Sequence, residues 1–192
     1  MSDHSEVKSF EKEMEKISPF ELKNRLIELA DESIRRMMRT MLNAGRGNPN
    51  WIATLPREAF FTLGRFGIQE CRRDWECPEG LAGIPQKEGI AARFGEFLHE
   101  QSNDAGARFL EKCFRYMLNE HSVDGDTLVH EWVEAVIGDQ YPVPDRILKH
   151  CEIAVRDYIA QELCDGRPPQ GEIDLFATEG GTAAMCYIFD SL

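Results

Sequence analysis

The sequence of 192 residues lacks the long apolar run that a membrane span requires. A transmembrane helix needs about 20 consecutive apolar residues, and no stretch of this chain approaches that length. The first 16 residues, MSDHSEVKSFEKEMEK, are charged throughout and contain no apolar core of the kind that a secretory signal has. We therefore expect neither a membrane span nor a secretory signal.

Positive charge is also scarce. The chain has 22 Lys and Arg against 34 Asp and Glu, a net charge of -12 at pH 7. Nucleic acids and anionic membranes attract basic surfaces, so we expect neither as a partner. With 42% hydrophobic residues, the chain could bury a core as one domain, or as one domain with an arm.

Paired metal-binding cysteines are missing as well. No CxxC pair occurs, and the histidines do not stand at zinc-ligand spacings relative to the cysteines. Several cysteines lie on apolar helical faces, such as Cys113 in FLEKCFRYML. We interpret the six as buried, reduced thiols of a cytoplasmic protein. Disulfides or a metal site remain the alternatives.

Helical periodicity covers most of the chain. The clearest helix start is at Ser18, which is followed by Pro19 and then by Glu21 in the pattern of a capping box. We expect this helix to bury its leucines, among them Leu22, Leu26 and Leu29. Further amphipathic segments predict helices over 56–73, 89–101, 104–119 and 126–137, the last ending at Gly138, and from Pro144 to Leu163.

One segment, residues 173–178 (IDLFAT), predicts a strand. A loop over 164–172 precedes it, and a glycine turn with a short helix follows it. A single strand cannot form a stable sheet, and the crossovers of a parallel sheet would have to lie beyond residue 192. We therefore interpret the chain as the opening part of an α/β protein, helical first and sheet later.

The turn after this strand, TEGGTAAM, has features of a phosphate-binding loop. A helix N-terminus exposes unpaired N–H groups and a partial positive charge. Gly180 and Gly181 would let the backbone approach a ligand closely, and Thr182 would add a hydroxyl donor. The motif is neither a P-loop nor a GxGxxG fingerprint. The alternative is a plain strand-to-helix turn.

Three further residues are candidates for binding. Arg46, between two glycines in AGRGNPNW, could hold a carboxylate with its planar guanidinium group. Tyr141 offers a hydroxyl on the proline-stiffened loop DQYPVPD, and Lys23 lies on the first helix. Their alternatives are a solvated loop arginine, a surface-packed aromatic ring and a solvent-facing lysine.

Taken together, four blocks carry a resemblance to a known family. They are SPFELKNRLIELA, MLNAGRGNPNWIATLPREAFFTLGRFG, YPVPDRIL and DLFATEGGTAAMCYIFDSL. The chain resembles the N-terminal portion of the aspartate 4-decarboxylases (aspartate β-decarboxylases), which are fold-type I pyridoxal-phosphate enzymes of the class I aminotransferase group. The blocks LNAGRGNPN and ATEGGTAAM are the most specific, whereas residues 72–103 carry no matching motif.

The resemblance implies roles for particular residues. Gly180, Gly181 and Thr182 would bind the phosphate of pyridoxal 5′-phosphate, and Tyr141 would reach across a dimer interface to the phosphate of the neighbouring subunit. The residues implied for the substrate L-aspartate are Asn43, Gly45, Arg46, which would pair with a carboxylate, and Lys23.

It also implies an architecture and an activity. The fold would be α/β, a pyridoxal-phosphate-dependent transferase fold truncated to its mainly helical N-terminal region plus the first strand and helix of the large domain. Its parts would be an arm and helix (1–42), the substrate loop and helical small domain (43–142) and the start of the cofactor domain (143–192). The reaction would convert L-aspartate to L-alanine and CO2, with side aminotransferase activity, in a homo-oligomer.

The same resemblance predicts that this chain is inactive alone. In the family, the lysine that forms the Schiff base with the cofactor follows the phosphate loop, and all seven lysines here precede it. We therefore expect an N-terminal fragment without catalytic residues of its own. A related class I aminotransferase and an inactive helical interaction module remain the alternatives.

Overall fold

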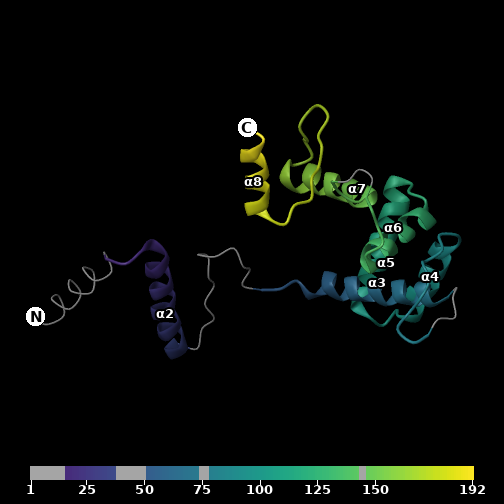
Figure 1. The fold of residues 1–192 in the computed structure, drawn as a ribbon, viewed down its shortest axis with the longest axis horizontal. Helices are drawn as coiled ribbons and strands as arrows, with labels where there is room; N and C mark the ends of the chain where they lie inside the picture. Colours follow the sequence, from purple (N-terminus) through teal and green to yellow (C-terminus); the bar gives the residue numbers. More distant parts are fainter. Residues whose placement is uncertain (1–15, 38–50, 74–77, 143–145) are drawn as a thin grey trace, which may run out of the picture. The chain divides into compact units, whose positions relative to one another are not determined.

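The structure of the chain is a computed structural model that describes residues 16–37, 51–73, 78–142 and 146–192, without the side chains of 34–37. This described part is helical and contains no strand (Figure 1). The chain divides into two units, residues 1–52 and 53–192. The domain boundaries expected after residues 42 and 142 stay predictions.

The first unit contributes one described helix, α2 (Pro19–Met37). Its capping box is confirmed, because the Ser18 N–H donates to the Glu21 carboxylate at 3.0 Å and the Glu21 N–H donates to Ser18 Oγ at 3.3 Å. The Ser18 N–H bond, together with the Ser18 hydroxyl, which donates to the same carboxylate at 2.8 Å, holds the pKa of Glu21 below its ordinary value. The expected burial of the leucines was wrong for Leu26, which is exposed. A capping box fixes where a helix begins, but its hydrogen bonds stay within that helix and do not supply a surface that buries its apolar face.

The second unit is built on four helices. They are α3 (Thr54–Arg73), α4 (Ile90–Glu100), α5 (Ala105–His121) and α6 (Gly125–Ile137). Helix α3 packs against α5 and α6, and α4 packs against α6 and α5. All four were expected from periodicity, with bounds that differ by a few residues.

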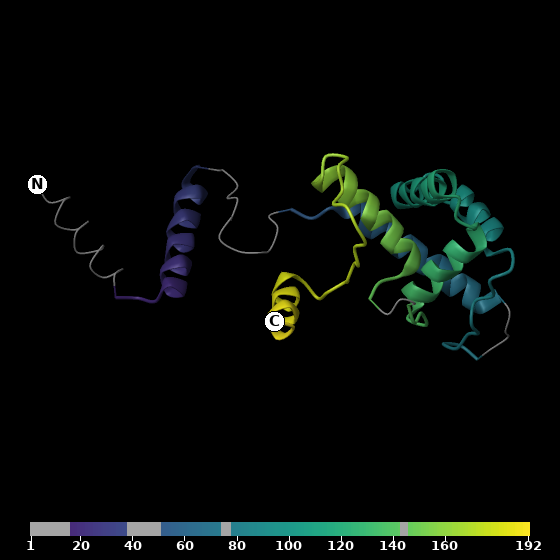
Figure 2. The ribbon, with the colours of Figure 1, turned by 90° about the horizontal axis from the view of Figure 1, so that it is seen from above.

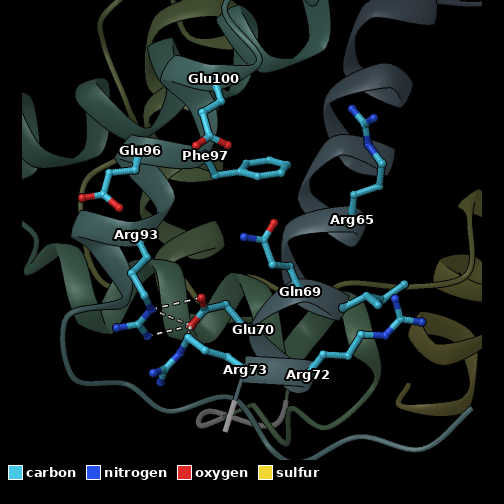
Figure 3. A pocket seen from close by; sticks show the side chains of 10 residues that line it. Arg65, Gln69, Glu70, Arg72, Arg73, Arg93, Glu96, Phe97 and Glu100 are labelled. Carbon is cyan, nitrogen blue, oxygen red and sulfur yellow. Dashed lines mark hydrogen bonds and ion pairs between the residues drawn. The ribbon is translucent and has the colours of Figure 1, made fainter. Parts of the chain in front are cut away.

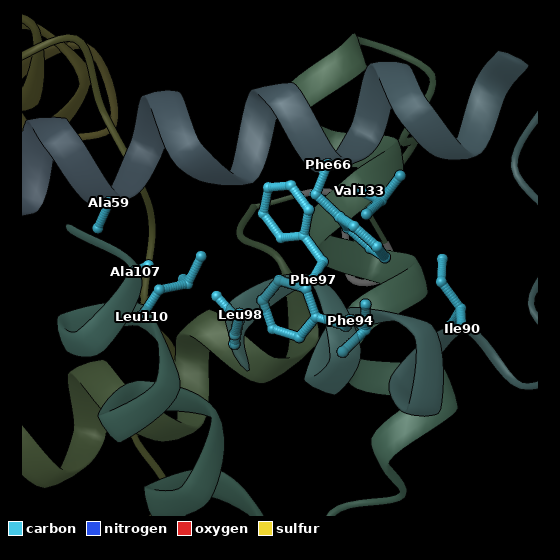
Figure 4. Close-up of a cluster of buried hydrophobic side chains, with 10 residues drawn as sticks. Ala59, Phe66, Ile90, Phe94, Phe97, Leu98, Ala107, Leu110 and Val133 are labelled. Atoms are coloured by element: carbon cyan, nitrogen blue, oxygen red, sulfur yellow. The ribbon is translucent and has the colours of Figure 1, made fainter. Parts of the chain in front are cut away.

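The buried side chains of these helices form one apolar core (Figure 4). Phe66 of α3 is fully buried and stacks at a tilt against two rings of α4, with centroids 4.9 Å from Phe94 and 5.3 Å from Phe97. Val129 and Val133 of α6 close the core from the side. Aromatic contacts of this kind add to the free energy that burial of the apolar area supplies.

The start of α5 lies unusually close to α3. A Cβ atom at Gly106 would stand 2.6 Å from the backbone carbonyl carbon of Glu58, so only glycine allows this approach. Asp104 caps α5 by accepting the Ala107 N–H at 2.7 Å, and Thr62 of α3 donates to the same carboxylate at 3.4 Å. A single cap therefore ends the preceding loop and joins two helices.

Helix α7 (Lys149–Tyr158) begins later than the sequence indicated. The predicted start at Pro144 falls in 143–145, outside the described residues, but 146–148 are not helical. The reason is a cap from another helix: Glu131 of α6 accepts the N–H groups of Lys149 at 2.9 Å and His150 at 3.1 Å. Figure 2 shows that α7 continues directly into the π-helical turn η1 (Ile159–Leu163).

A second contact fastens the far end of α7. Asp157 accepts a hydrogen bond from the Tyr116 hydroxyl of α5, and its Oδ2 lies 2.7 Å from His121 Nε2. The Tyr116 bond is the main cause that lowers the pKa of Asp157, and the neighbouring histidine adds to it. Helix α7 is thus held to α6 at its start and to α5 near its end.

The strand expected over residues 173–178 is wrong: the segment has no regular secondary structure and belongs to no sheet. Backbone pairing needs a neighbouring strand, and the described residues offer none. The segment follows the predicted loop over 164–172 and leads to a final helix, α8 (Gly181–Asp190).

The cysteines of the described residues are less buried than the sequence indicated. All five are free; four are half-buried, and Cys186 is exposed, contrary to the expectation of buried thiols. Burial raises the pKa of the Cys113 and Cys151 thiols. Over the same residues no group of three potential metal ligands occurs, and no helix is long and apolar enough to cross a bilayer.

Replacing Phe66 by alanine should lower the free energy of unfolding by about 3–5 kcal/mol, because it leaves a cavity beneath both rings of α4. Phe61→Ala is the matched control on the same helix: this ring is 68% exposed, so we expect a change within about 0.5 kcal/mol. Urea unfolding followed by circular dichroism measures both. Equal losses would contradict the assignment of the core.

Replacing Tyr116 by phenylalanine should raise the pKa of Asp157 toward the ordinary aspartate value of about 3.9. Since the folded pKa is lowered, the stabilisation is present above about pH 3.9 and is lost as the pH falls through the lower folded pKa. The variant should therefore lose less stability on acidification. Carboxyl-carbon NMR titration measures the shift, with Tyr158→Phe as control, and an unchanged Asp157 pKa would contradict it.

Candidate functional site

The turn at the start of α8 has a backbone conformation that favours glycine. Gly180 has φ 114° and ψ 175°, a combination that is essentially restricted to glycine. Its carbonyl accepts the first bond of the helix, from the Ala184 N–H at 3.1 Å. The predicted turn into a helix is therefore confirmed, and it explains why glycine stands at position 180.

The space in front of this turn is open. A Cβ atom built on Gly180 or on Gly181 would meet no atom within 4 Å. The N–H groups of Gly181, Thr182 and Ala183 precede the first helical bond, and no side chain caps this end of α8. The Thr182 side chain is exposed at the same end. This arrangement of donors suits an anion with several oxygen atoms.

Two side chains next to the turn, Thr178 and Glu179, have hydrogen-bond partners of their own. The Thr178 hydroxyl donates to the Gly180 carbonyl at 3.3 Å and braces the turn. The Tyr187 hydroxyl donates to the Glu179 carboxylate at 3.3 Å, two turns along the helix. The Glu179 carboxylate is thereby bound to a residue of α8, and the N-terminus of that helix carries a partial positive charge.

Arg146, a residue that the sequence did not single out, holds the segment that leads into the turn. Its guanidinium group lies 2.9 Å from the Asp174 carboxylate, and its carbonyl accepts the Ala177 N–H at 3.0 Å. Arg146 belongs to the block YPVPDRIL and the other two residues to DLFATEGG. In the sequence, Arg146 was marked only by its position in the matched block YPVPDRIL, shortly after two prolines. Its contact partners follow only from the fold.

Within the described part of residues 53–192, no hydrogen bond or ion pair joins Tyr141 to the turn. Tyr141 is 86% exposed and points its ring to solvent. Lys23 of α2 lies in the other unit, with its Nζ 4.6 Å from the ring centroid of Phe20. Asn43, Gly45 and Arg46 lie outside the described residues, so their roles stay predictions.

A separate hollow of about 520 Å³ lies between α3 and α4 (Figure 3). At one side of it Glu70, which is 1% exposed, receives the Arg93 guanidinium, with Nη2 2.6 Å from Oε2. Arg65 and Arg72 line the same hollow. Tyr141, Gly180, Gly181 and Thr182 do not line it, and the ion pair joins α3 to α4.

Comparison with known proteins supports the resemblance on which the site rests. No protein-family model matches the chain. The chain is 45% identical over 177 residues, 92% of its length, to the bifunctional aspartate aminotransferase and L-aspartate beta-decarboxylase of a Pseudomonas species. The predicted resemblance to the aspartate β-decarboxylases is confirmed.

The extent of the match limits what it says. The chain spans about a third (33%) of the length of this curated relative. An identity of this size over 177 residues covers the region 72–103 at least in part, where the sequence offered no motif. It does not assign individual roles, so the parts played by Gly180, Gly181, Thr182 and Tyr141 stay predictions.

Replacing Gly180 by alanine should loosen the start of α8, because a non-glycine residue in this conformation costs about 1–3 kcal/mol. Gly181→Ala is the control: it stands in open space at the first helical position and should be neutral or stabilising by up to about 1 kcal/mol. Hydrogen exchange of the Ala184 amide, read by NMR, reports both. Equal exchange in the two variants would contradict the strained geometry.

Proposed function

We propose that this chain supplies the phosphate-binding turn and part of the substrate site of a pyridoxal 5′-phosphate enzyme. The enzyme would remove the β-carboxylate of L-aspartate to give L-alanine and CO2, with aminotransferase activity as a side reaction. The observation that carries the proposal is the 45% identity over 177 residues to the bifunctional enzyme. The fold of the whole protein would be fold type I, with residues 143–192 opening the cofactor domain.

The fit of the cofactor phosphate to the turn is supported by three features. Gly180 and Gly181 leave room within 4 Å, no side chain occupies the helix N-terminus, and the hydroxyl of Thr182 is exposed. The N–H groups of the first turn of α8 and this hydroxyl would donate to the phosphate oxygens. A dianion is stabilised there by the helix dipole as well as by the hydrogen bonds.

The chemistry divides between the cofactor and the chain. When bound, pyridoxal 5′-phosphate supplies an electron-withdrawing ring for the bonds broken at the amino acid. The chain would supply binding and orientation: Arg46 would pair with a substrate carboxylate through two parallel hydrogen bonds, supported by Asn43 and Gly45, with Lys23 close by. Fixed at one carboxylate, the substrate is held in a single orientation.

Tyr141 has a different place in the proposal. Its side chain is 86% exposed, which suits a hydroxyl that donates to a phosphate bound by another subunit. The active protein would accordingly be a homo-oligomer of at least two chains, and we propose that it works in the cytoplasm. The Schiff-base lysine is not among the seven lysines of this sequence, so we expect binding but no turnover from these 192 residues alone.

The test is the conversion of L-aspartate labelled with ¹³C at its β-carboxylate by the purified product of the gene, with pyridoxal 5′-phosphate added. We expect labelled CO2 and L-alanine from a product that carries the lysine, and cofactor-phosphate binding without turnover from the 192 residues alone. Transfer of the amino group to 2-oxoglutarate without CO2 would favour an aminotransferase. If the protein binds neither pyridoxal 5′-phosphate nor L-aspartate, the result would favour the helical interaction module and contradict the proposal.

A further inference from the structure

Two sequence blocks that lie about 30 residues apart meet at a single side chain. The Arg146 Nη2 atom lies 2.9 Å from Asp174 Oδ1, and its guanidinium carbon lies 5.8 Å from the centroid of the Phe176 ring. The Arg146 carbonyl accepts the Ala177 N–H. One residue of the block that contains Tyr141 therefore touches three residues of the block that forms the glycine turn.

The same network includes a second arginine. Glu152 of α7, whose side chain is 13% exposed, lies 2.6 Å from Arg156 and 3.4 Å from Arg146. Arg156 also donates to the Ile173 carbonyl. The hydrogen bond from Arg156 is the main cause that lowers the pKa of Glu152. This carboxylate therefore stays charged between Arg146 and Arg156.

Arg146 adopts this position at a cost. Its side chain is only 24% exposed, and its Nε is the one buried side-chain nitrogen or oxygen of the described residues that has no hydrogen-bond partner. A buried N–H without a partner is unfavourable. The contacts to Asp174, Phe176 and Ala177 offset that cost.

These contacts replace the sheet that residues 173–178 lack. The segment is tethered at Ile173, Asp174 and Ala177, and Gly180 follows three residues later. Because the turn binds through several N–H groups at once, its affinity depends on their being held together before the ligand arrives. The tether on the preceding residues supplies that order.

We propose that Arg146 is a positioning residue that orders the phosphate-binding turn through its contacts with Asp174, Phe176 and Ala177. The inference rests on the proposed function, since it takes the turn to be the phosphate site. Arg146 does not itself touch the phosphate. It acts on the backbone that presents Gly180 and α8.

The experiment compares Arg146→Gln, Asp174→Asn and Arg146→Lys with a matched control, Arg115→Gln, in the 192-residue chain. Arg115 also pairs with a glutamate, but on the surface of α5 and at 70% exposure. Hydrogen exchange read by mass spectrometry, without ligand, reports the order of residues 173–184. Pyridoxine 5′-phosphate and pyridoxine, which lack the reactive aldehyde, report the contribution of the phosphate to binding.

We expect faster exchange over 173–184 in Arg146→Gln and Asp174→Asn, while the α3–α6 helices and the control stay unchanged. Affinity for pyridoxine 5′-phosphate should fall about threefold to tenfold, the range expected for a partly exposed charged pair, and that for pyridoxine should not change. Arg146→Lys, which keeps the charge near Asp174, should recover most of both effects.

Two results would overturn the inference. Unchanged exchange over 173–184 in Arg146→Gln would show that Arg146 does not order the segment. Faster exchange with an unchanged preference for the phosphorylated ligand would show a structural contact without a role in binding. If the unaltered chain binds both ligands equally, the phosphate site itself is wrong, and the positioning role falls with it whatever the exchange data show about the tether.

Discussion

A buried carboxylate on α6 connects the four-helix core to α7, the helix that leads to the candidate site. Glu131 is 8% exposed and accepts the first two N–H groups of α7, while its Oε2 lies 2.6 Å from His150 Nδ1. Burial of a carboxylate is unfavourable unless hydrogen bonds replace its water. Here all of them come from one helix end, so forming the core and starting α7 at Lys149 are coupled.

The position of the candidate site depends on that coupling in steps. Helix α7, once capped by Glu131 and fastened by Asp157 to Tyr116, carries Glu152 and Arg156 at one side. Those residues and Arg146 hold the segment 173–178, which leads to the glycine turn at Gly180. Each step uses charged or backbone hydrogen bonds where an apolar core is absent. The core around Phe66 is thus held by apolar packing, whereas the glycine turn is connected to it through polar contacts.

The functional interpretation rests on two kinds of observation that agree. The geometry offers an open, uncapped helix N-terminus behind two glycines, which by itself suits many anions. The similarity to the bifunctional aspartate enzyme is the reason for proposing the phosphate of pyridoxal 5′-phosphate as that anion. Neither alone would be enough, because helix N-termini are common and because the chain spans a third of its relative.

The sequence by itself determined the local elements: the capping box at Ser18, the presence of the helices, the glycine turn and the family resemblance. These follow from interactions between residues close in the chain, whose spacing can be read directly. Only the tertiary structure decided the start of α7 at Lys149, the absence of a strand over 173–178 and the contacts of Arg146. Each of these depends on residues far away in sequence. The helix start depends on Glu131, the arginine contacts on Asp174, and a strand would need a neighbouring strand. A local sequence pattern does not show which distant groups will meet.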